Sequence, residues 1–336
     1  MTITAPLQDP QGRMVHYLRV SVTDRCDFRC RYCMQEKMTF LPKSDVLTLE
    51  EMEHICEIFI KRGVKKIRIT GGEPLVRKGV GSLFEKLGSH IKAGGLDELT
   101  LTTNASQLPV YARQLASCGV RRVNISLDSL QPERFRHITR IGELHQTMGG
   151  VVAAKEAGLK VKINMVVVQG QNDDEIDTFI QWCGDEGLDL VLIEAMPLGD
   201  IEESRSDQYL SLQTVRSRLE EKWTLSADQS FSTGGPARYW NIAETGGRIG
   251  FISPMSDHFC ATCNRVRITC TGMLYPCLGD MGGVDLRAVL RSGGTEADLN
   301  EAINLALAGK PDGHTFLEDL MSGDFSVQRH MNVTGG

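Results

Sequence analysis

Six of the ten cysteines in this 336-residue chain fall into two groups of three, each within a short stretch of sequence. Cysteine thiolates spaced this closely bind zinc ions or iron–sulfur clusters. A closed tetrahedral zinc site needs four protein ligands, so each group has one thiolate too few. The groups are Cys26, Cys30 and Cys33 in DRCDFRCRYC, and Cys260, Cys263 and Cys277 in FCATCNRVRITCTGMLYPC.

The spacing alone leaves two solutions open for the missing fourth ligand. A zinc site would borrow another side chain: a distant histidine for the first group, and His258 or Cys270 for the second. An iron–sulfur cubane has four irons, so three thiolates would leave one iron free to bind a small molecule. The amino and carboxylate groups of a methionine moiety could chelate such an iron.

Two arginines, Arg265 and Arg267, follow the first two cysteines of the second group. If this segment is a strand, their side chains share one face because side chains alternate along a strand. Two guanidinium groups beside a three-thiolate site suit a phosphate held by paired hydrogen bonds. The plainer alternative is a pair of arginines in solvent on an exposed hairpin.

The elements that must position these residues alternate between strands and helices from about residue 15 to 197. Each short β-rich run is followed by an amphipathic stretch, and Thr48 with Glu51 forms a capping-box signature at the start of the first helix. Six such units predict a parallel sheet with right-handed crossovers. The expected strands are 17–22, 66–70, 98–104, 122–127, 160–168 and 190–196, and the expected helices begin near 48 and lie near 79–92, 108–118, 147–158 and 173–187.

One face of the expected strands is polar and partly cationic. A closed eight-stranded barrel fills its interior with branched apolar side chains, so this pattern instead predicts an incomplete, wider six-unit barrel whose lumen holds an anionic ligand. The alternative is a sheet with one solvated face, but parallel sheets usually have both faces covered. The apolar face has Val20, Ile67, Ile69, Val123, Ile125, Val161 and Ile163; the polar face has Arg19, Ser21, Lys66, Arg68, Thr70, Thr102, Asn104, Asn124, Ser126, Lys162 and Asn164.

The remaining sequence predicts a small α+β extension, so we expect a partial barrel over 1–199 and the extension over 200–336. Residues 200–232 have a helical, charged pattern, and hairpins are expected around Gly246-Gly247 and Thr271-Gly272. One or two helices should follow near 285–307. The first cysteine group comes directly after the first strand, at the end of an α/β barrel where catalytic residues lie.

Composition excludes several classes of protein. The net charge of −6 argues against a nucleic-acid-coating protein, and no apolar run approaches the length of a membrane span. The N-terminus lacks the basic and apolar segments of a secretory signal, so we expect a cytoplasmic protein. Ten cysteines in such a chain are better explained as metal ligands than as a disulfide framework. Cys56, Cys118, Cys183 and Cys270 match no cluster spacing, and we expect them to be packed in the core.

The first cysteine group resembles the CxxxCxΦC motif of the radical S-adenosylmethionine (SAM) enzymes, with Tyr32 as the aromatic residue. The segment TGGEP at residues 70–74 is similar to the GGEP segment of those enzymes, which contacts the amino group of the methionine moiety. Glycines there let the backbone approach a ligand closely. Both motifs stand at the ends of expected strands. The resemblance implies an α/β fold with an incomplete (β/α)6 radical SAM barrel.

From YLRVSVTDRCDFRCRYCM to the last residue, the chain resembles the GTP 3′,8-cyclase family of molybdenum cofactor (molybdopterin) biosynthesis. Further matching segments are KIRITGGEPLVR, LTTN, NISLDSL, KINMVV, IEAMPLGD and CNRVRITCTG. The C-terminal MNVTGG is similar to the Gly-Gly tail that reaches into the active site of that family, here Gly335 and Gly336. Without the resemblance, such an end would be expected to fray.

The resemblance implies two [4Fe-4S] clusters, one on each cysteine group, with SAM at the first and GTP at the second. Val191 stands where the family commonly has an arginine, so one phosphate contact could be missing. The implied SAM-binding residues are Tyr32, Gly72, Ser126 and Met196; the implied GTP-binding residues are Arg19, Arg68, Thr102, Lys162, Arg265, Val266 and Arg267.

The implied enzyme is a lyase that converts GTP to (8S)-3′,8-cyclo-7,8-dihydroguanosine 5′-triphosphate while SAM is cleaved to 5′-deoxyadenosine and methionine. Implied partners are an electron donor, a second copy in a homodimer and the next enzyme, cyclic pyranopterin monophosphate synthase. The rival hypotheses are another radical SAM enzyme with an auxiliary cluster, such as one that modifies a peptide, and a zinc-binding interaction protein without catalysis.

Overall fold

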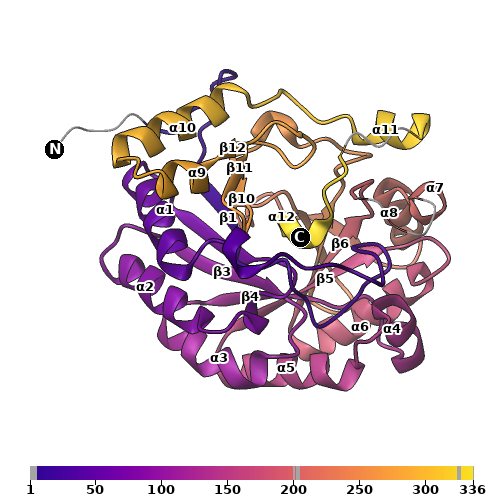
Figure 1. Ribbon diagram of the computed structural model, residues 1–336. Coiled ribbons are helices and arrows are strands. Elements are labelled where there is room, and N and C mark those ends of the chain that lie inside the picture. Colours follow the sequence, from indigo (N-terminus) through magenta and orange to yellow (C-terminus); the bar gives the residue numbers. More distant parts are fainter. Residues whose placement is uncertain (1–5, 200, 202–204, 324–326, 336) are drawn as a thin grey trace.

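A computed structural model describes residues 6–199, 201, 205–323 and 327–335, and its centre is a curved sheet of parallel strands (Figure 1). The six expected strands are confirmed, and each pairs in parallel with the next along the chain. They are β1 (Tyr17–Ser21), β2 (Lys66–Thr70), β3 (Glu98–Thr103), β4 (Arg122–Ser126), β5 (Lys160–Val167) and β6 (Asp189–Glu194).

Helices cover the outside of this sheet. Both halves of the capping box at Thr48 and Glu51 are present at the first helix. One helix, α4, was not expected: it buries only Phe135, Ile138 and Thr139, which is too few for a clear apolar stripe. The α-helices between the six strands are α1 (Leu49–Lys61), α2 (Val80–Lys92), α3 (Leu108–Ser117), α4 (Pro132–Thr139), α5 (Leu144–Glu156) and α6 (Ile176–Glu186). Short 3-10 helices lie at η1 (Lys43–Asp45), η2 (Pro74–Val76) and η3 (Asp173–Glu175).

Both faces of the six strands are buried, as the lumen hypothesis requires. The apolar face packs under the helices in the main hydrophobic core, with all seven predicted residues in it. The polar face is enclosed as well: Lys162 is 3% exposed, and Arg19 and Arg68 are each 9% exposed. A solvated polar face, the alternative, is therefore wrong.

The extension adds strands to both edges of the same sheet, which the sequence did not predict. Strand β9 pairs in parallel with β6, and β10 pairs in parallel with β1, so eight consecutive strands from β10 through β1–β6 to β9 run in one direction. Both predicted hairpins are confirmed. The added strands are β7 (Leu225–Ala227), β8 (Arg238–Ile242), β9 (Arg248–Ile252), β10 (Arg265–Ile268), β11 (Met273–Tyr275) and β12 (Val284–Asp285). The division of the chain at residue 199 stays a prediction.

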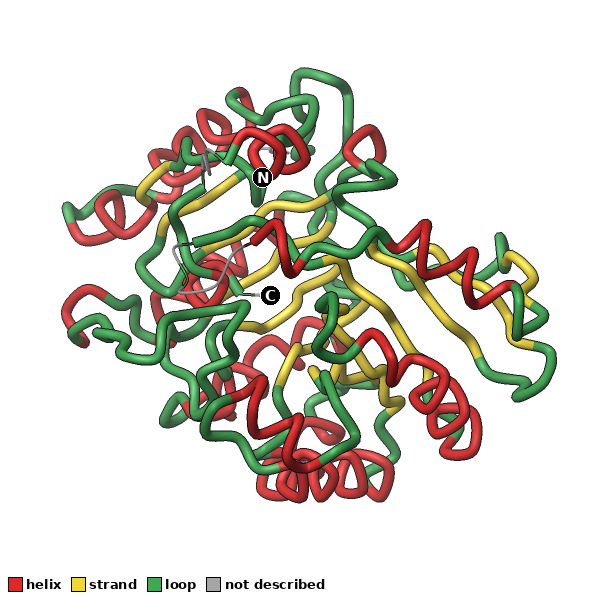
Figure 2. The backbone as a smooth tube through the Cα atoms, turned by 90° about the vertical axis from the view of Figure 1, so that its right-hand side faces the viewer, coloured by secondary structure: helices red, strands yellow, loops and turns green. Residues whose placement is uncertain are grey.

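In Figure 1 the helices of the extension lie around the open side of the barrel, and Figure 2 shows most helices of the molecule outside the curved sheet of strands. The expected helical region at 200–232 is only partly right, because two short helices there are followed by β7; residues 200 and 202–204 lie outside the described part. In Figure 1 the C-terminal segment lies over the centre of the barrel. The remaining helices are α7 (Arg205–Gln208), α8 (Leu212–Glu220), η4 (Cys260–Thr262), α9 (Leu286–Arg291), α10 (Glu296–Ala308), α11 (Phe316–Ser322) and α12 (Met331–Thr334).

The four cysteines outside the two groups are core residues, as predicted. Cys56, Cys118, Cys183 and Cys270 are buried in the main hydrophobic core. Cys270 is therefore committed to packing and is not a fourth ligand for the second group. Within the described part of the chain, no helix combines the length and the apolar character needed to cross a membrane.

Candidate active site

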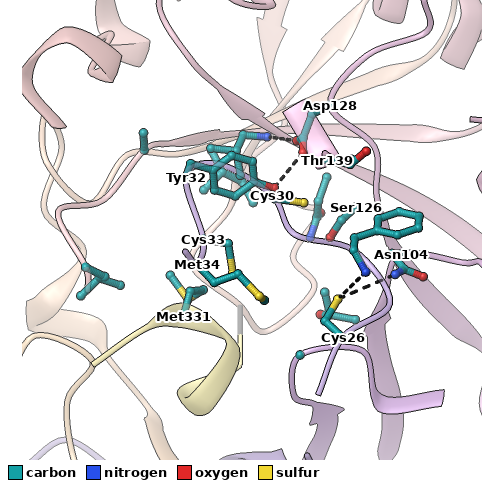
Figure 3. A pocket seen from close by; sticks show the side chains of 18 of the residues that line it. Cys26, Cys30, Tyr32, Cys33, Met34, Asn104, Ser126, Asp128, Thr139 and Met331 are labelled. Carbon is teal, nitrogen blue, oxygen red and sulfur yellow. Dashed lines mark hydrogen bonds between the residues drawn. The ribbon is translucent and has the colours of Figure 1, made fainter. Parts of the chain in front are cut away.

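The first cysteine group lines a cavity at the carboxyl ends of the parallel strands (Figure 3). The cavity has a volume of about 1180 Å³, part of it open to solvent. Cys26, Cys30 and Cys33 lie on the loop after β1, and the TGGEP segment after β2 packs directly against this loop. A Cβ atom on Gly72 would collide with the carbonyl oxygen of Arg25, so only glycine permits this approach.

Glu73 of the TGGEP segment joins β2 to β3 and does not line the cavity. Its buried carboxyl group accepts hydrogen bonds from the Thr103 hydroxyl at 2.8 Å and from the backbone N–H groups of Asn104 and Leu75 at 2.6 and 3.0 Å. Burial raises the pKa of Glu73 to about 8. The segment is therefore fixed at its acidic residue, while its glycines face the cysteine loop.

A hydrogen-bonded chain holds Tyr32 against the cavity wall. The Tyr32 hydroxyl donates to Asp128 at 2.7 Å, and the other Asp128 oxygen accepts from the backbone N–H of Val166 at 2.9 Å. Burial raises the pKa of Asp128 to about 6. From the extension, Arg205 donates to the backbone oxygen of Tyr32 at 2.8 Å and also to that of Leu198. Figure 3 shows Tyr32 and Asp128 side by side above the three cysteines.

The residues expected to bind SAM all lie on this cavity. Tyr32, Gly72, Ser126 and Met196 line it together with the three cysteines. Asn164 lines it too, and its buried side-chain oxygen has no hydrogen-bond partner among the described residues. Because an unpaired buried acceptor is costly, this oxygen suits a donor group of a bound ligand. The sequence singled out Asn164 as a polar-face residue but gave it no role.

The second cysteine group lies at the opposite end of the barrel lumen. Strand β10 runs parallel to β1 with Arg265 opposite Tyr17, so Cys260 and Cys263 lie beyond the amino ends of these strands. Cys277 reaches the same end because β11 runs back antiparallel to β10. A five-residue strand such as β1 is about 16 Å long, so roughly this distance separates the two ends of the lumen.

Neither cysteine group has the spacing of a single-ion site. With Zn–S bonds of about 2.3 Å, the sulfurs of a tetrahedral site are about 3.8 Å apart. Among the described residues, one group of three possible metal ligands has all its ligand atoms within 4.8 Å of one another. It consists of His258, Cys260 and His314. The three sulfurs of each triad do not all lie within that distance, which is compatible with a polynuclear cluster whose ligated irons are spread over a cube. His258 is nonetheless near Cys260, as the zinc alternative for the second group required.

Cations surround the second triad. Arg265 and Lys310 approach the Cys263 sulfur at 3.9 and 3.7 Å. Burial alone would raise the pKa of Cys263, but these two cations lower it to about 7. A thiolate is the form that ligates iron or zinc, so this end of the lumen favours the ligating state of Cys263.

The lumen between the two triads carries a cross-strand row of arginines. Arg267 on β10 lies opposite Arg19 on β1, which lies opposite Arg68 on β2. Tyr17 lies among them: burial would raise its pKa, but Arg68, Arg19 and other nearby cations lower it. Among the described residues, no carboxylate lies within 4.0 Å of the lumen cations Arg68, Lys162, Arg265 and Arg267. Such buried positive charge is costly unless an anion binds.

The other residues expected to contact GTP differ in their placement. Thr102 lies beside Arg68, with 3.5 Å between its hydroxyl and the guanidinium. Val266 points the other way and packs in the core, so its side chain cannot reach a ligand in the lumen. The two arginines flanking it are the members of this stretch that face the lumen.

The C-terminal tail enters the lumen. Arg267 donates to the backbone oxygen of Gly335 at 3.3 Å, and a Cβ on Gly335 would collide with Thr70. Gly335 also has a φ of 75°, which favours glycine. Met331 of the same tail lines the first cavity (Figure 3). Gly336, the other expected tail residue, lies outside the described residues.

Tyr239 is a lumen residue that sequence reasoning missed. The Lys162 ammonium donates to its hydroxyl at 3.1 Å, and Thr233 is hydrogen-bonded to the same hydroxyl at 3.2 Å. Burial, with nearby cations, lowers the pKa of Lys162 well below its usual value. The Tyr239 ring lies against Gly250 and packs with Val191, so it occupies the space beside the position where an arginine was expected.

Comparisons with known proteins agree with this geometry. The family model described as Radical SAM superfamily matches residues 20–183, and the one described as Molybdenum Cofactor Synthesis C matches residues 188–316. Together they span both cysteine groups.

Two relatives and one solved structure illustrate the likeness. The GTP 3′,8-cyclase of Brucella canis is 57% identical over 333 residues, which cover 99% of this chain and 96% of that protein. The GTP 3′,8-cyclase of Rhodopseudomonas palustris is 56% identical over 335 residues, covering 100% of this chain and 97% of that protein. The structure of Streptococcus suis SuiB bound to S-adenosylmethionine superposes with a TM-score of 0.59 at 14% identity, covering 95% of this chain and 77% of SuiB, and shows a common fold.

Proposed function

Because this chain belongs to the GTP 3′,8-cyclase family of radical SAM enzymes, we propose how its own residues carry out that reaction. The enzyme, a lyase, converts GTP to (8S)-3′,8-cyclo-7,8-dihydroguanosine 5′-triphosphate and cleaves SAM to 5′-deoxyadenosine and methionine, as the first step of molybdenum cofactor biosynthesis. One observation carries the assignment of the substrate site: Arg68, Lys162, Arg265 and Arg267 line the lumen between the two cysteine triads, and no carboxylate of the described residues lies within 4.0 Å of them.

Cys26, Cys30 and Cys33 would hold the [4Fe-4S] cluster of the radical SAM family, at the wall of the first cavity. When bound, this cluster supplies the electron that cleaves SAM to methionine and a 5′-deoxyadenosyl radical. The close approach permitted by Gly72 brings backbone groups to the SAM methionine, and the Tyr32–Asp128 hydrogen bond fixes the cysteine loop. The side-chain oxygen of Asn164 accepts a hydrogen bond from SAM.

The triphosphate of GTP would bind the arginine row of the lumen. Arg19, Arg68 and Arg267 present guanidinium groups from three neighbouring strands, and charge-assisted hydrogen bonds from arginine to phosphate are strong. Lys162, held by Tyr239, adds a further cation on the far wall, where Val191 replaces the expected arginine. Their shared task is placement: the ribose C3′ hydrogen must meet the radical, and C3′ must then bond to C8 of guanine.

Cys260, Cys263 and Cys277 would hold a second [4Fe-4S] cluster at the other end of the lumen. Three ligands would leave one iron open for a substrate group, and with the phosphates on the arginines the guanine would be the part of GTP nearest to it. Membership of the cyclase family supports this assignment, and the rival is a zinc ion on His258, Cys260 and His314, whose ligand atoms lie within 4.8 Å of one another. The tail residue Gly335, held by Arg267, helps to close the lumen against water.

The family membership also supports four assignments outside the lumen. We infer a cytoplasmic enzyme that acts as a homodimer, receives electrons from a separate donor and passes its product to cyclic pyranopterin monophosphate synthase. Sedimentation of the anaerobic protein tests the dimer, and transfer of product to the purified synthase tests the last step.

The decisive test incubates the reduced protein, purified without oxygen, with SAM and GTP. We expect 5′-deoxyadenosine and the 3′,8-cyclised nucleotide in equal amounts, with neither formed when SAM is omitted. If 5′-deoxyadenosine appears without any cyclised nucleotide, while an added peptide is modified, the peptide-modifying alternative holds. If neither product forms and the protein carries zinc, the catalytic proposal fails.

A further inference from the structure

Lys310 is a buried lysine, just after α10, for which the reaction described above has no use. It is 3% exposed. Its ammonium group donates to the Cys263 sulfur at 3.7 Å, to the backbone oxygen of Arg265 at 2.8 Å and to that of Pro276 at 2.7 Å. A lysine ammonium has three N–H donors, so each of them has an acceptor.

The three acceptors come from both arms of the second triad. Cys263 and Arg265 belong to the arm that leads into β10, whereas Pro276 immediately precedes Cys277 on the returning arm. One ammonium group therefore ties together the two chain segments that carry the triad. Among the described residues the ammonium group of Lys310 donates to these two arms alone, while its backbone N–H donates to Leu307 at the end of α10.

The charge of Lys310 also needs a counter-ion. A fully buried lysine is rare unless it is paired with an anion. Among the described residues no carboxylate lies within 4.0 Å of its ammonium group, and the acceptor that can carry a full negative charge is the Cys263 thiolate. The lysine is therefore matched to a negatively charged sulfur, which is the form that binds iron.

We propose that Lys310 is a positioning residue of the second cluster, which fixes both arms of the triad and stabilises the reduced, more negative state of that cluster. This inference rests on the proposed second cluster. Hydrogen bonds and charges around the cysteine sulfurs are among the factors that set the potential of an iron–sulfur centre. A cation at a ligating sulfur makes it easier to add an electron, so the potential of the second cluster is higher with Lys310 than without it.

The test compares wild type with Lys310→Met and Lys310→Arg, all purified without oxygen. Met keeps most of the length of the side chain without its charge, and Arg keeps the charge. Iron content is measured first, and then potentiometric titration followed by electron paramagnetic resonance gives the potential of each cluster, with the first-cluster signal identified in Cys263→Ala. Lys92→Met, which removes an exposed lysine from α2, is the matched control.

We expect Lys310→Met to lower the potential of the second cluster and leave the first unchanged, while Lys310→Arg and Lys92→Met stay near wild type. Loss of the second cluster in Lys310→Met, with its retention in Lys310→Arg, also supports the proposal. An unchanged potential in iron-replete Lys310→Met overturns it, and so does equal loss of the cluster in both variants. If wild type itself carries only the first cluster, the proposed function of the second triad fails, which is a different result.

Discussion

The two cysteine triads have the same ligands and the same number of them, yet their surroundings differ in charge. Around the first triad, burial raises the pKa of Cys26 and Cys30, and Glu73 and Asp128 raise them further. Around the second, Arg265 and Lys310 lower the pKa of Cys263 to about 7 despite its burial. The end with the first triad is therefore mainly apolar and acidic, although the rise that burial causes in the pKa of Cys33 is partly offset by Arg205, and the other end is cationic.

This difference matches what each end must bind. SAM carries a positive sulfonium, and its cleavage needs a strongly reducing electron; burial and the Asp128 carboxylate, once ionised, would make a cluster on the first triad a stronger reductant because added negative charge is disfavoured there. GTP carries a negative triphosphate, which the cationic end attracts. On the proposed assignment, the cysteine spacing would specify cluster binding at both ends, and the neighbouring charges would decide which substrate each cluster meets.

Removing one cysteine from each triad gives the largest contrast. We expect Cys26→Ala to abolish both 5′-deoxyadenosine formation and cyclisation, because the first cluster loses a ligand. Cys263→Ala should abolish cyclisation but leave slow, uncoupled SAM cleavage. Chromatographic quantification of both products checks this, with Cys56→Ala, in the core, as a control for cysteine loss. Equal loss of both activities in Cys263→Ala would contradict the division of tasks.

The acidic end makes stability depend on pH. The pKa of Glu73 is about 8 in the folded protein against 4.5 for an ordinary glutamate, so the folded state holds this proton more tightly. Its contribution to stability is complete below about pH 4.5 and is lost as pH rises through 8, with a total on the order of several kcal/mol. Relative to Glu73→Gln, wild type should therefore lose stability between pH 5 and 8.5 in urea unfolding. The control is Glu133→Gln, an exposed position at which the stability difference from wild type should not change with pH. If the stability difference between wild type and Glu73→Gln is equally independent of pH, Glu73 ionises normally and the prediction fails.

The cationic row sharpens the comparison through substrate binding. Arg267→Met should raise the KM for GTP by about 10- to 150-fold, because a hydrogen bond to a charged group contributes about 1.5–3 kcal/mol. Uncoupled SAM cleavage should persist, since Arg267 itself does not line the first cavity. Steady-state kinetics with Arg218→Met, an exposed arginine of α8, as control measures this. An equal fall in SAM cleavage would show that Arg267 acts on the SAM site, which contradicts its assignment to GTP binding.

The smallest effect is expected at Tyr239. Tyr239→Phe removes the hydroxyl that holds Lys162 and keeps the ring that packs on Gly250. Loss of one hydrogen bond of about 1 kcal/mol should weaken GTP binding roughly fivefold, with kcat almost unchanged. Isothermal titration of GTP to the anaerobic protein measures it. An unchanged affinity would show that Tyr239 does not position Lys162 for the substrate.

Local patterns made much of this molecule predictable from its sequence. The six strands, the polar face and the place of the first triad follow from alternation and from residues adjacent in the chain, and the structure confirms these elements. The capping box at Thr48 is equally local.

What the sequence did not predict depends on contacts between distant segments. Pairing of β10 with β1 joins residues more than 240 positions apart, and the sequence of neither strand indicates which strand it will pair with. Lys310 and Tyr239 are single residues with no spacing signal, and only the folded chain brings them to Cys263 and Lys162. Sequence reasoning assigned Glu73 no role apart from its motif, and its hydrogen bonds go to Thr103 at the end of β3 and to the adjoining Asn104.

Iron and acid-labile sulfide content of the protein purified without oxygen tests the central claim most directly. Two cubanes in one chain predict about eight irons and eight sulfides in wild type, and about four of each in both Cys26→Ala and Cys263→Ala. About four irons in wild type, with stoichiometric zinc that disappears in Cys263→Ala, would contradict the assignment of a cluster to the cationic end.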